Sequence, residues 1–148
     1  MYRDKIWFPF YNVVSLDDLK SFIEVNMLEH LDIRIVDMTD HGLTATMPVD
    51  RRTQQPMGLL HGGASCVLAE SLGSIASYLC VDPDRCDVVG LEINANHIRS
   101  VKGGLVRGTC TPIHLGRSSH IWEIKIKDEE DRLVCVSRMT NAILDKER

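Results

Sequence analysis

The spacing of apolar residues predicts two helices in this chain. A short helix is expected over residues 15–26, because Leu19, Phe22 and Ile23 fall on one helical face. A longer helix is expected from about Gly63 to Cys80, where apolar and small residues recur every three or four positions. Its buried stripe is predicted to comprise Ala64, Val67, Leu68, Ser71, Leu72, Ile75, Ala76 and Leu79.

Elsewhere apolar and polar residues alternate, which is the period of half-buried β-strands. Two strands, beginning at Leu31 and Leu43, form a hairpin before the long helix. Residues 50–60 form a loop. Four strands follow the helix, over residues 88–98, 105–112, 119–127 and 133–144.

This order of elements predicts one α+β domain over residues 1–148, with residues 1–14 as an N-terminal extension. A six-stranded antiparallel sheet wrapped around one long central helix satisfies it. The edge strands of such a sheet must be paired or protected, which favours a dimer.

The amino-acid composition limits the kinds of partner and the cellular location that we expect for the protein. The net charge of −4 argues against a general attraction to nucleic acid. No apolar run reaches the roughly 18 residues of a membrane span, and no signal peptide is apparent. The five cysteines include no CxxC pair, which favours reduced, mostly buried thiols and a cytoplasmic location.

Aromatic residues are concentrated at the N-terminus. We expect this tail to fold onto its own domain or onto a neighbouring subunit; the alternative is a membrane or partner contact. Five of the chain's eight aromatic residues lie there: Tyr2, Trp7, Phe8, Phe10 and Tyr11.

The sequence lacks the motifs of several common chemistries. It contains no phosphate-binding GxxxxGK or GxGxxG loop and no GxSxG nucleophile elbow. The six histidines show no metal-ligand spacing, so we expect neither a metal nor a cofactor. His30, His41 and His120 are interpreted as surface or packing residues.

The segment His61-Gly62-Gly63 lies where the long helix begins, and there backbone N–H groups lack acceptors within the helix. Glycine at position 62 would let an acyl oxygen approach its N–H, as in an oxyanion hole. Alternatively, the two glycines simply turn the chain into the helix.

Glu70 is the one carboxylate of the long helix. Among buried neighbours it would be desolvated and its pKa raised, which a catalytic role would explain. Alternatively, it pairs with a distant arginine or a backbone donor. The nearby Cys66 is interpreted as a small core residue.

The spacing of Gly62 and Glu70 bears on how they could cooperate. Eight positions of helix span roughly 12 Å, which a glutamate side chain cannot cover. If both residues serve one reaction, they must come from two subunits with antiparallel helices. The hypothesis therefore requires a homodimer with two composite sites.

Three stretches, QPMGLLHGGASCVLAE, VVGLEINANHIR and HLGRS, closely resemble the hotdog-fold acyl-CoA thioesterases. The similarity covers about residues 31–144 and is strongest to the subgroup that uses a helix glutamate. That subgroup includes bacterial 1,4-dihydroxy-2-naphthoyl-CoA hydrolases, which implies menaquinone biosynthesis, and proofreading thioesterases of aryl-siderophore synthesis. The N-terminus departs from it, being about ten residues longer.

The resemblance implies hydrolysis of an aromatic acyl-CoA, with coenzyme A as part of the substrate, and a homotetramer built from dimers. Glu70 would be the nucleophile or general base and the Gly62 N–H the oxyanion donor. Gln55 and His61 would polarise or position the thioester, and Ser74 would hold the carboxylate or water. The implied coenzyme A contacts are Gly90, His97, Ile98, Arg99, Ser100, His114, Leu115, Gly116, Arg117, Ser118 and Ser119.

The cations Arg99, Lys102 and Arg117 could pair with phosphates of the coenzyme. Three alternatives stay open: hydrolysis of acyl groups on a carrier protein, a hydratase of the same fold, and a non-catalytic acyl-CoA binding module. The retained Glu70 argues against the last, and no histidine and acid arrangement typical of the hydratases is present.

Overall fold

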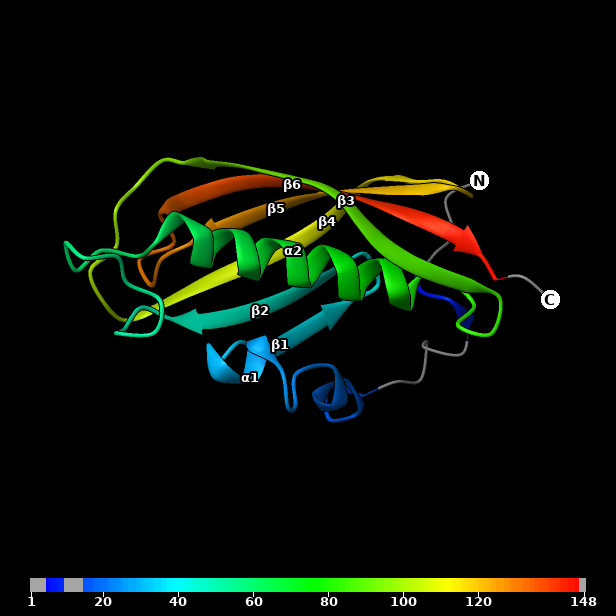
Figure 1. Cartoon of the computed structure of the whole chain (residues 1–148), viewed down its shortest axis with the longest axis horizontal. Helices are drawn as coiled ribbons and strands as arrows, with labels where there is room; N and C mark the ends of the chain where they lie inside the picture. Colours follow the sequence, from blue (N-terminus) through cyan, green and yellow to red (C-terminus); the bar gives the residue numbers. More distant parts are fainter. Residues whose placement is uncertain (1–4, 10–14, 147–148) are drawn as a thin grey trace.

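One antiparallel sheet and one long helix dominate the fold (Figure 1). The structure is a computed structural model and describes residues 5–9 and 15–146. The strand order is β1-β2-β4-β5-β6-β3, with every neighbouring pair antiparallel. The strands are β1 (Arg34–Thr39), β2 (Gly42–Pro48), β3 (Cys86–His97), β4 (Leu105–Leu115), β5 (Ser119–Lys127) and β6 (Leu133–Asp145).

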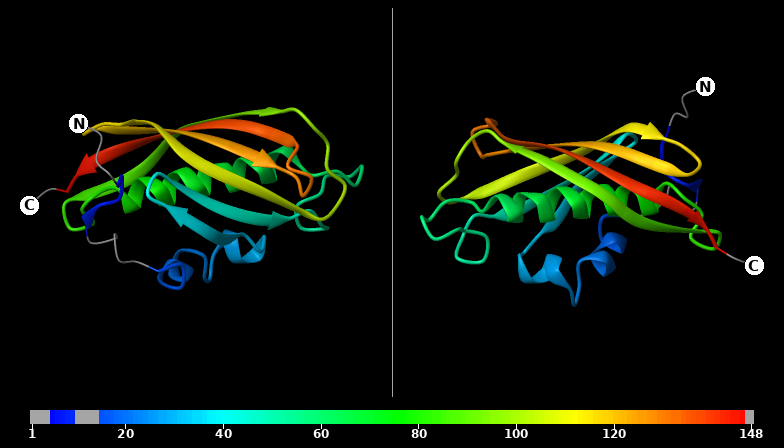
Figure 2. Two further views of the ribbon diagram at one scale, coloured as in Figure 1. Left: turned by 180° about the vertical axis from the view of Figure 1, so that it is seen from behind. Right: turned by 45° about the horizontal axis from the view of Figure 1, so that its top comes forward.

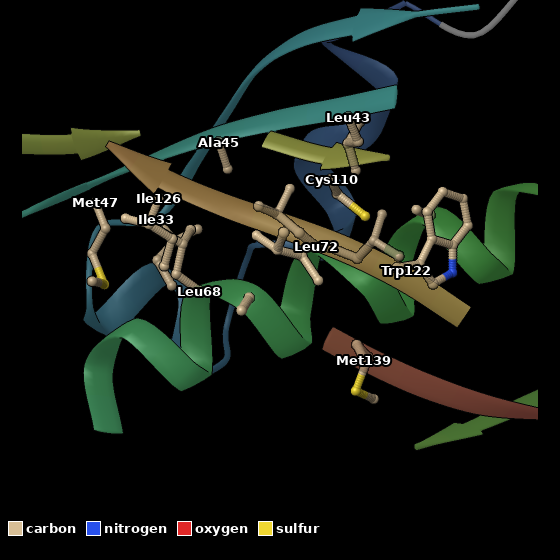
Figure 3. Close-up of a cluster of buried hydrophobic side chains, with 14 of the residues drawn as sticks. Ile33, Leu43, Ala45, Met47, Leu68, Leu72, Cys110, Trp122, Ile126 and Met139 are labelled. Atoms are coloured by element: carbon tan, nitrogen blue, oxygen red, sulfur yellow. The ribbon is translucent and has the colours of Figure 1, made fainter. Parts of the chain in front are cut away.

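The long helix α2 (Gly62–Leu79) lies along one face of the curved sheet and contacts strands β2 to β6 (Figures 1 and 2). The predicted six-stranded antiparallel sheet with its long helix is therefore present. The core lies between helix and sheet and includes Leu68 and Leu72 of α2 together with Trp122 of β5 and Met139 of β6 (Figure 3). Burial of these apolar side chains is the main force that fixes α2 on the sheet.

The buried stripe of α2 is rotated from the predicted one. Gly73 and Ser77, expected on an open face of small residues, are buried against the sheet. A β-carbon on Gly73 would stand 2.9 Å from the Met139 Cγ, so glycine is needed for the close approach of helix and strand. Val67 and Ser71, expected in the stripe, are only half-buried.

The predicted short helix is split into two turns. The 3-10 turn η2 (Asp18–Phe22) ends before Val25, whose φ of 60° breaks the helix. Asn26 then caps a second turn, α1 (Met27–His30), by accepting a hydrogen bond from the Leu28 N–H. The helical pattern therefore continues past Asn26, and β1 begins three residues later than expected.

The described part of the N-terminal tail packs on its own domain. Trp7 is buried and donates its indole N–H to the Thr39 carbonyl at 2.7 Å, and the Phe8 N–H bonds the Leu79 carbonyl. The other aromatic residues of the tail, Tyr2, Phe10 and Tyr11, lie outside the described residues.

Candidate active site

The N-terminus of α2 presents a free donor. His61 precedes the helix in an extended conformation, and its Nδ1 accepts the Gly63 N–H at 2.8 Å. The His61 carbonyl accepts hydrogen bonds from Ala64 and Ser65. The Gly62 N–H has no acceptor among the described residues, so it is available to a ligand at the positive end of the helix dipole.

His97 lies against this donor. It is the last residue of β3, and a β-carbon built on Gly62 would stand 2.6 Å from its Nε2. Gly62 was predicted as the oxyanion donor and His97 as a coenzyme A contact, and the structure brings the two residues together. The absence of a side chain at position 62 is what leaves room for the imidazole.

Glu70 lies farther along α2, beside Gly90 of β3. Its Oε1 is 3.3 Å from the position that a Gly90 β-carbon would occupy. Glu70 also lines an open hollow of about 320 Å³ between α2 and the N-terminal turns. The other residues around this hollow are Phe22, Met27, Leu28, Val67, Ser71, Ser74 and Ile75.

The expectation that Glu70 is buried is wrong for the single chain. Its side chain is exposed, and no ion pair with a described arginine or lysine holds it. The reason is its place on α2: Glu70 lies outside the stripe that packs into the core, beside the edge strand β3. Glu70 therefore projects from α2 as an unpaired acceptor.

Ser74 follows Glu70 by one helical turn, as expected. Its hydroxyl donates to Asn141 Oδ1 at 3.4 Å, whereas no hydrogen bond joins it to Glu70 in the described part of the chain. Asn141 was not predicted at the site. The available signal was its place in β6, at an inward-facing position between Met139 and Ile143.

Gln55 lies in the loop before α2. Its side-chain carbonyl accepts a hydrogen bond from the Met57 N–H, and its backbone N–H bonds the Leu59 carbonyl. These bonds shape a tight turn in which Gly58 has a φ of 75°. The side-chain amide nitrogen of Gln55 has no acceptor among the described residues and remains free to donate.

The two segments predicted to hold coenzyme A lie at opposite ends of α2 (Figures 1 and 2). The segment 97–100 runs beside the loop before α2, since the neighbouring Val101 carbonyl accepts the Leu60 N–H. The segment 114–119 joins β4 to β5 at the other end, where Ile143 N–H bonds the Ser118 carbonyl. They do not line one site within a single chain.

The three cations predicted to contact coenzyme A also lie at opposite ends of α2. Arg99 and Lys102 lie at the N-terminal end of α2, exposed and without an ion pair to any described carboxylate. Arg117 lies at the far end, 3.5 Å from Asp145, and both side chains are largely exposed. Such an ion pair is weak, so the Arg117 guanidinium remains available to an anion.

Two other titratable groups near these segments are electrically neutral. Burial raises the pKa of the Cys66 thiol, and the negative charge of Glu70 raises it further. Burial also lowers the pKa of His120 to about 4, with a contribution from His114. Cys66 is therefore a thiol rather than a thiolate nucleophile, and His120 is a packing histidine against Trp122.

No group of three or more histidine, cysteine, aspartate or glutamate side chains within residues 5–9 and 15–146 could hold a metal ion. In the same ranges, no helix has the length and apolar character to cross a membrane.

Comparison with known proteins identifies the class to which this fold and site belong. Residues 57–135, which include the start of α2, Glu70 and His97, match the thioesterase superfamily. The chain belongs to this family: its fold is of the hotdog thioesterase type, and it is a thioester hydrolase.

Individual relatives are similar over most of their length. The chain is 57% identical to the 1,4-dihydroxy-2-naphthoyl-CoA hydrolase of Escherichia coli (strain K12), over 88% of this chain and 96% of that protein. It is 53% identical to the proofreading thioesterase EntH of Cronobacter sakazakii, over 88% and 95%. A crystal structure of a mutant thioesterase from Pseudomonas aeruginosa superposes with a TM-score of 0.91 at 44% identity, covering 96% of this chain and all of that one.

Proposed function

We propose that the protein hydrolyses an aromatic acyl-CoA thioester in a site built from two subunits. Gly62 N–H binds the oxygen of the thioester carbonyl, and Glu70 of the partner subunit supplies the base or nucleophile. The observation that carries this proposal is the placing of a free N–H and an exposed, unpaired carboxylate eight residues apart on one helix.

The separation along α2 supports a composite site. Roughly 12 Å of helix lies between Gly62 and Glu70, more than one side chain spans. β3 is an edge strand with a free side, and Val89 and Leu91 on it are exposed. Pairing of two β3 edges about a two-fold axis would bring antiparallel α2 helices together and cover these residues.

The same pairing would bring the two segments predicted to hold coenzyme A to one site. Residues 97–100 lie near the start of α2 and residues 114–119 near its end, so antiparallel helices bring one segment of each subunit to one site. Arg99, Lys102 and Arg117 then face one ligand with three cations, which suits the phosphates of coenzyme A. By resemblance to the family, two such dimers form a tetramer.

The hollow beside Glu70 suits an aromatic acyl group. Phe22, Leu28, Val67 and Ile75 give it apolar walls, while Glu70 and Ser74 add polar oxygens to its lining. A flat ring buried there would place its thioester carbonyl next to the carboxylate. The E. coli relative is named for a dihydroxynaphthoyl-CoA substrate, an acyl group of this kind.

Two routes satisfy the chemistry. In the first, a Glu70 oxygen attacks the carbonyl carbon, the C–S bond breaks, the CoA thiolate takes a proton from water, and a second water hydrolyses the resulting anhydride. In the second, Glu70 takes a proton from water as that water attacks the carbon, and the proton passes to the departing thiolate. In both, the Gly62 N–H stabilises the negative oxygen. Single-turnover hydrolysis in 18O-water separates the routes, because only the first puts label into Glu70.

A carrier-protein thioester is the second candidate substrate. The similarity to EntH, named as a proofreading thioesterase, favours it, and coenzyme A and carrier proteins share the phosphopantetheine arm. Comparing kcat/KM for one acyl group on both carriers decides between them.

The free state of all five cysteines supports a reducing compartment such as the cytoplasm.

A panel of naphthoyl, benzoyl, phenylacetyl and straight-chain CoA thioesters tests the proposal. We expect the aromatic thioesters to give the highest kcat/KM, and Glu70→Gln to lower kcat about 10²- to 10⁴-fold. Glu123→Gln, at a half-buried carboxylate on β5 that pairs with Lys125, is the matched control and should retain full activity. Equal rates for Glu70→Gln and wild type would refute the mechanism and would favour a non-catalytic role for the carboxylate.

A further inference from the structure

A buried polar network joins α2 to the sheet one turn beyond Glu70. Asn141 of β6 is fully buried, and its Nδ2 donates to the Gly73 carbonyl at 3.1 Å and to Ser77 Oγ at 2.8 Å. Trp122 of β5 donates its indole N–H to the same Ser77 Oγ at 2.7 Å. Trp122 is labelled in Figure 3 on the sheet side of α2.

The chemistry of these groups fixes which way the Asn141 amide points. A backbone carbonyl can only accept a hydrogen bond, so the atom that faces Gly73 must be the nitrogen. The opposite orientation would set the Asn141 oxygen against the Gly73 carbonyl oxygen, two acceptors with no proton between them. Asn141 Oδ1 must therefore face the other way, toward Ser74.

That orientation assigns the Ser74 proton. Ser74 Oγ is 3.4 Å from Asn141 Oδ1, and an amide oxygen can only accept, so the serine hydroxyl donates. With its proton held on the sheet side, the Ser74 oxygen offers only lone pairs to the hollow that it shares with Glu70.

An acceptor at this point suits water attack. Ser74 lies one turn from Glu70 on the same side of α2, so a water between them would donate one proton to each oxygen. A lone pair of that water would then face away from the Glu70 and Ser74 oxygens, toward the carbonyl carbon of the thioester. If the Ser74 hydroxyl instead donated to the water, the water would have to turn a lone pair toward the serine.

We propose that Asn141 is a positioning residue for hydrolysis: it holds the Ser74 hydroxyl as an acceptor toward the water that Glu70 activates. The inference rests on the proposed function of Glu70. It concerns the second route, in which Glu70 is a free carboxylate and takes a proton from the attacking water.

A double-mutant cycle tests this role. On the best thioester of the panel, Asn141→Ala and Ser74→Ala should each lower kcat about three- to tenfold, the worth of one hydrogen bond, with KM within about twofold of wild type. Because Asn141 acts through Ser74, the double variant should be no slower than Ser74→Ala. Losses that multiply in the double variant would overturn the proposal, as would an unchanged kcat in Asn141→Ala.

Trp122→Phe is the matched control. It removes the other donor to Ser77 without altering the Asn141–Ser74 contact, so it should lower Tm while kcat stays at the wild-type value. A drop in kcat as large as that of Asn141→Ala would assign both effects to general loosening of the core and would refute the positioning role.

Two further measurements guard against a variant that does not fold. Asn141→Ser, a smaller polar truncation, repeats the cycle. In the unaltered protein, NMR should show the Asn141 side-chain amide protons exchanging slowly and close to Ser77; rapid exchange would contradict the hydrogen bonds that orient the amide. Failure of the cycle in an enzyme that still depends on Glu70 would refute this inference alone, whereas full activity of Glu70→Gln would refute the proposed function.

Discussion

The imidazole of His97 occupies the space beside the Gly62 α-carbon: a β-carbon there would stand 2.6 Å from Nε2 and 3.0 Å from Cε1. The end of β3 and the beginning of α2 therefore meet at a glycine. The same glycine carries the free N–H proposed to bind the thioester oxygen. This one contact therefore fixes the imidazole next to that backbone donor.

Gly62→Ala is expected to lower activity through His97. Because the nearest atoms to the new methyl group are all in the His97 ring, the ring must move away from the site. In a His97→Ala background the clash is gone, so adding Gly62→Ala should change kcat/KM by no more than about twofold. Steady-state kinetics of the two single variants and the double variant check this. A large further loss in the double variant would mean that the methyl group obstructs the substrate itself.

Gly62→Pro, made together with His97→Ala, should abolish the oxyanion interaction while keeping the helix. Proline is tolerated at the first position of a helix, and His61, with φ −71° and ψ 131°, has the extended backbone that a residue before proline requires. The matched variant Gly62→Ala with His97→Ala retains the N–H. We expect the proline variant to have a kcat about 10²- to 10³-fold lower than the alanine variant.

Circular dichroism and Tm show whether the two variants share the same fold. If they are equally active, the Gly62 N–H plays no part in the reaction, and the segment His61-Gly62-Gly63 serves only to turn the chain into α2.

His120 should make stability depend on pH. Its pKa is lowered from 6.5 to about 4 by burial in the folded protein, so the unfolded chain binds a proton more readily. This contribution to stability is fully present above pH 6.5 and is lost as pH falls toward 4, by roughly 1 kcal/mol per pH unit.

Urea unfolding at pH 7.5 and pH 5 measures this effect. Protonation of carboxylates also destabilises the fold in acid. The useful quantity is therefore the difference between wild type and His120→Phe in the free energy of unfolding lost between the two pH values. The phenylalanine keeps an aromatic ring against Trp122 but does not titrate. The variant should lose less stability between the two pH values than the wild type. Parallel losses in the two proteins would show that His120 does not stay neutral in the fold.

Much of the fold could be predicted because its elements follow simple periods. The alternation of apolar residues located all six strands, and the range predicted for β5, residues 119–127, matches the structure. The end of β4 was missed by three residues, since a bulge after Pro112 lets the strand continue where proline was read as its end. The break at Val25 was also missed, because a valine with positive φ has no sequence signal.

The site was predictable in its parts but not in its arrangement. The motif placed Gly62 and Glu70 on one helix, whereas the meeting of Gly62 with His97 depends on strand pairing across 35 residues of chain. Which face of α2 is buried depended on the large side chains of Trp122 and Met139, which need Gly73 and Ser77 opposite them. For the same reason the exposure of Glu70 could not be inferred from the helix pattern alone.

The composite site is tested most directly by mixing two inactive chains. One carries Gly62→Pro with His97→Ala, and the other carries Glu70→Gln; the two are unfolded together and refolded as a mixture. If Gly62 of one subunit works with Glu70 of its partner, each mixed dimer has one intact site, and random pairing restores about a quarter of wild-type activity. If both residues served one site within a single chain, every site would carry a defect, and the mixture would be as inactive as its two components.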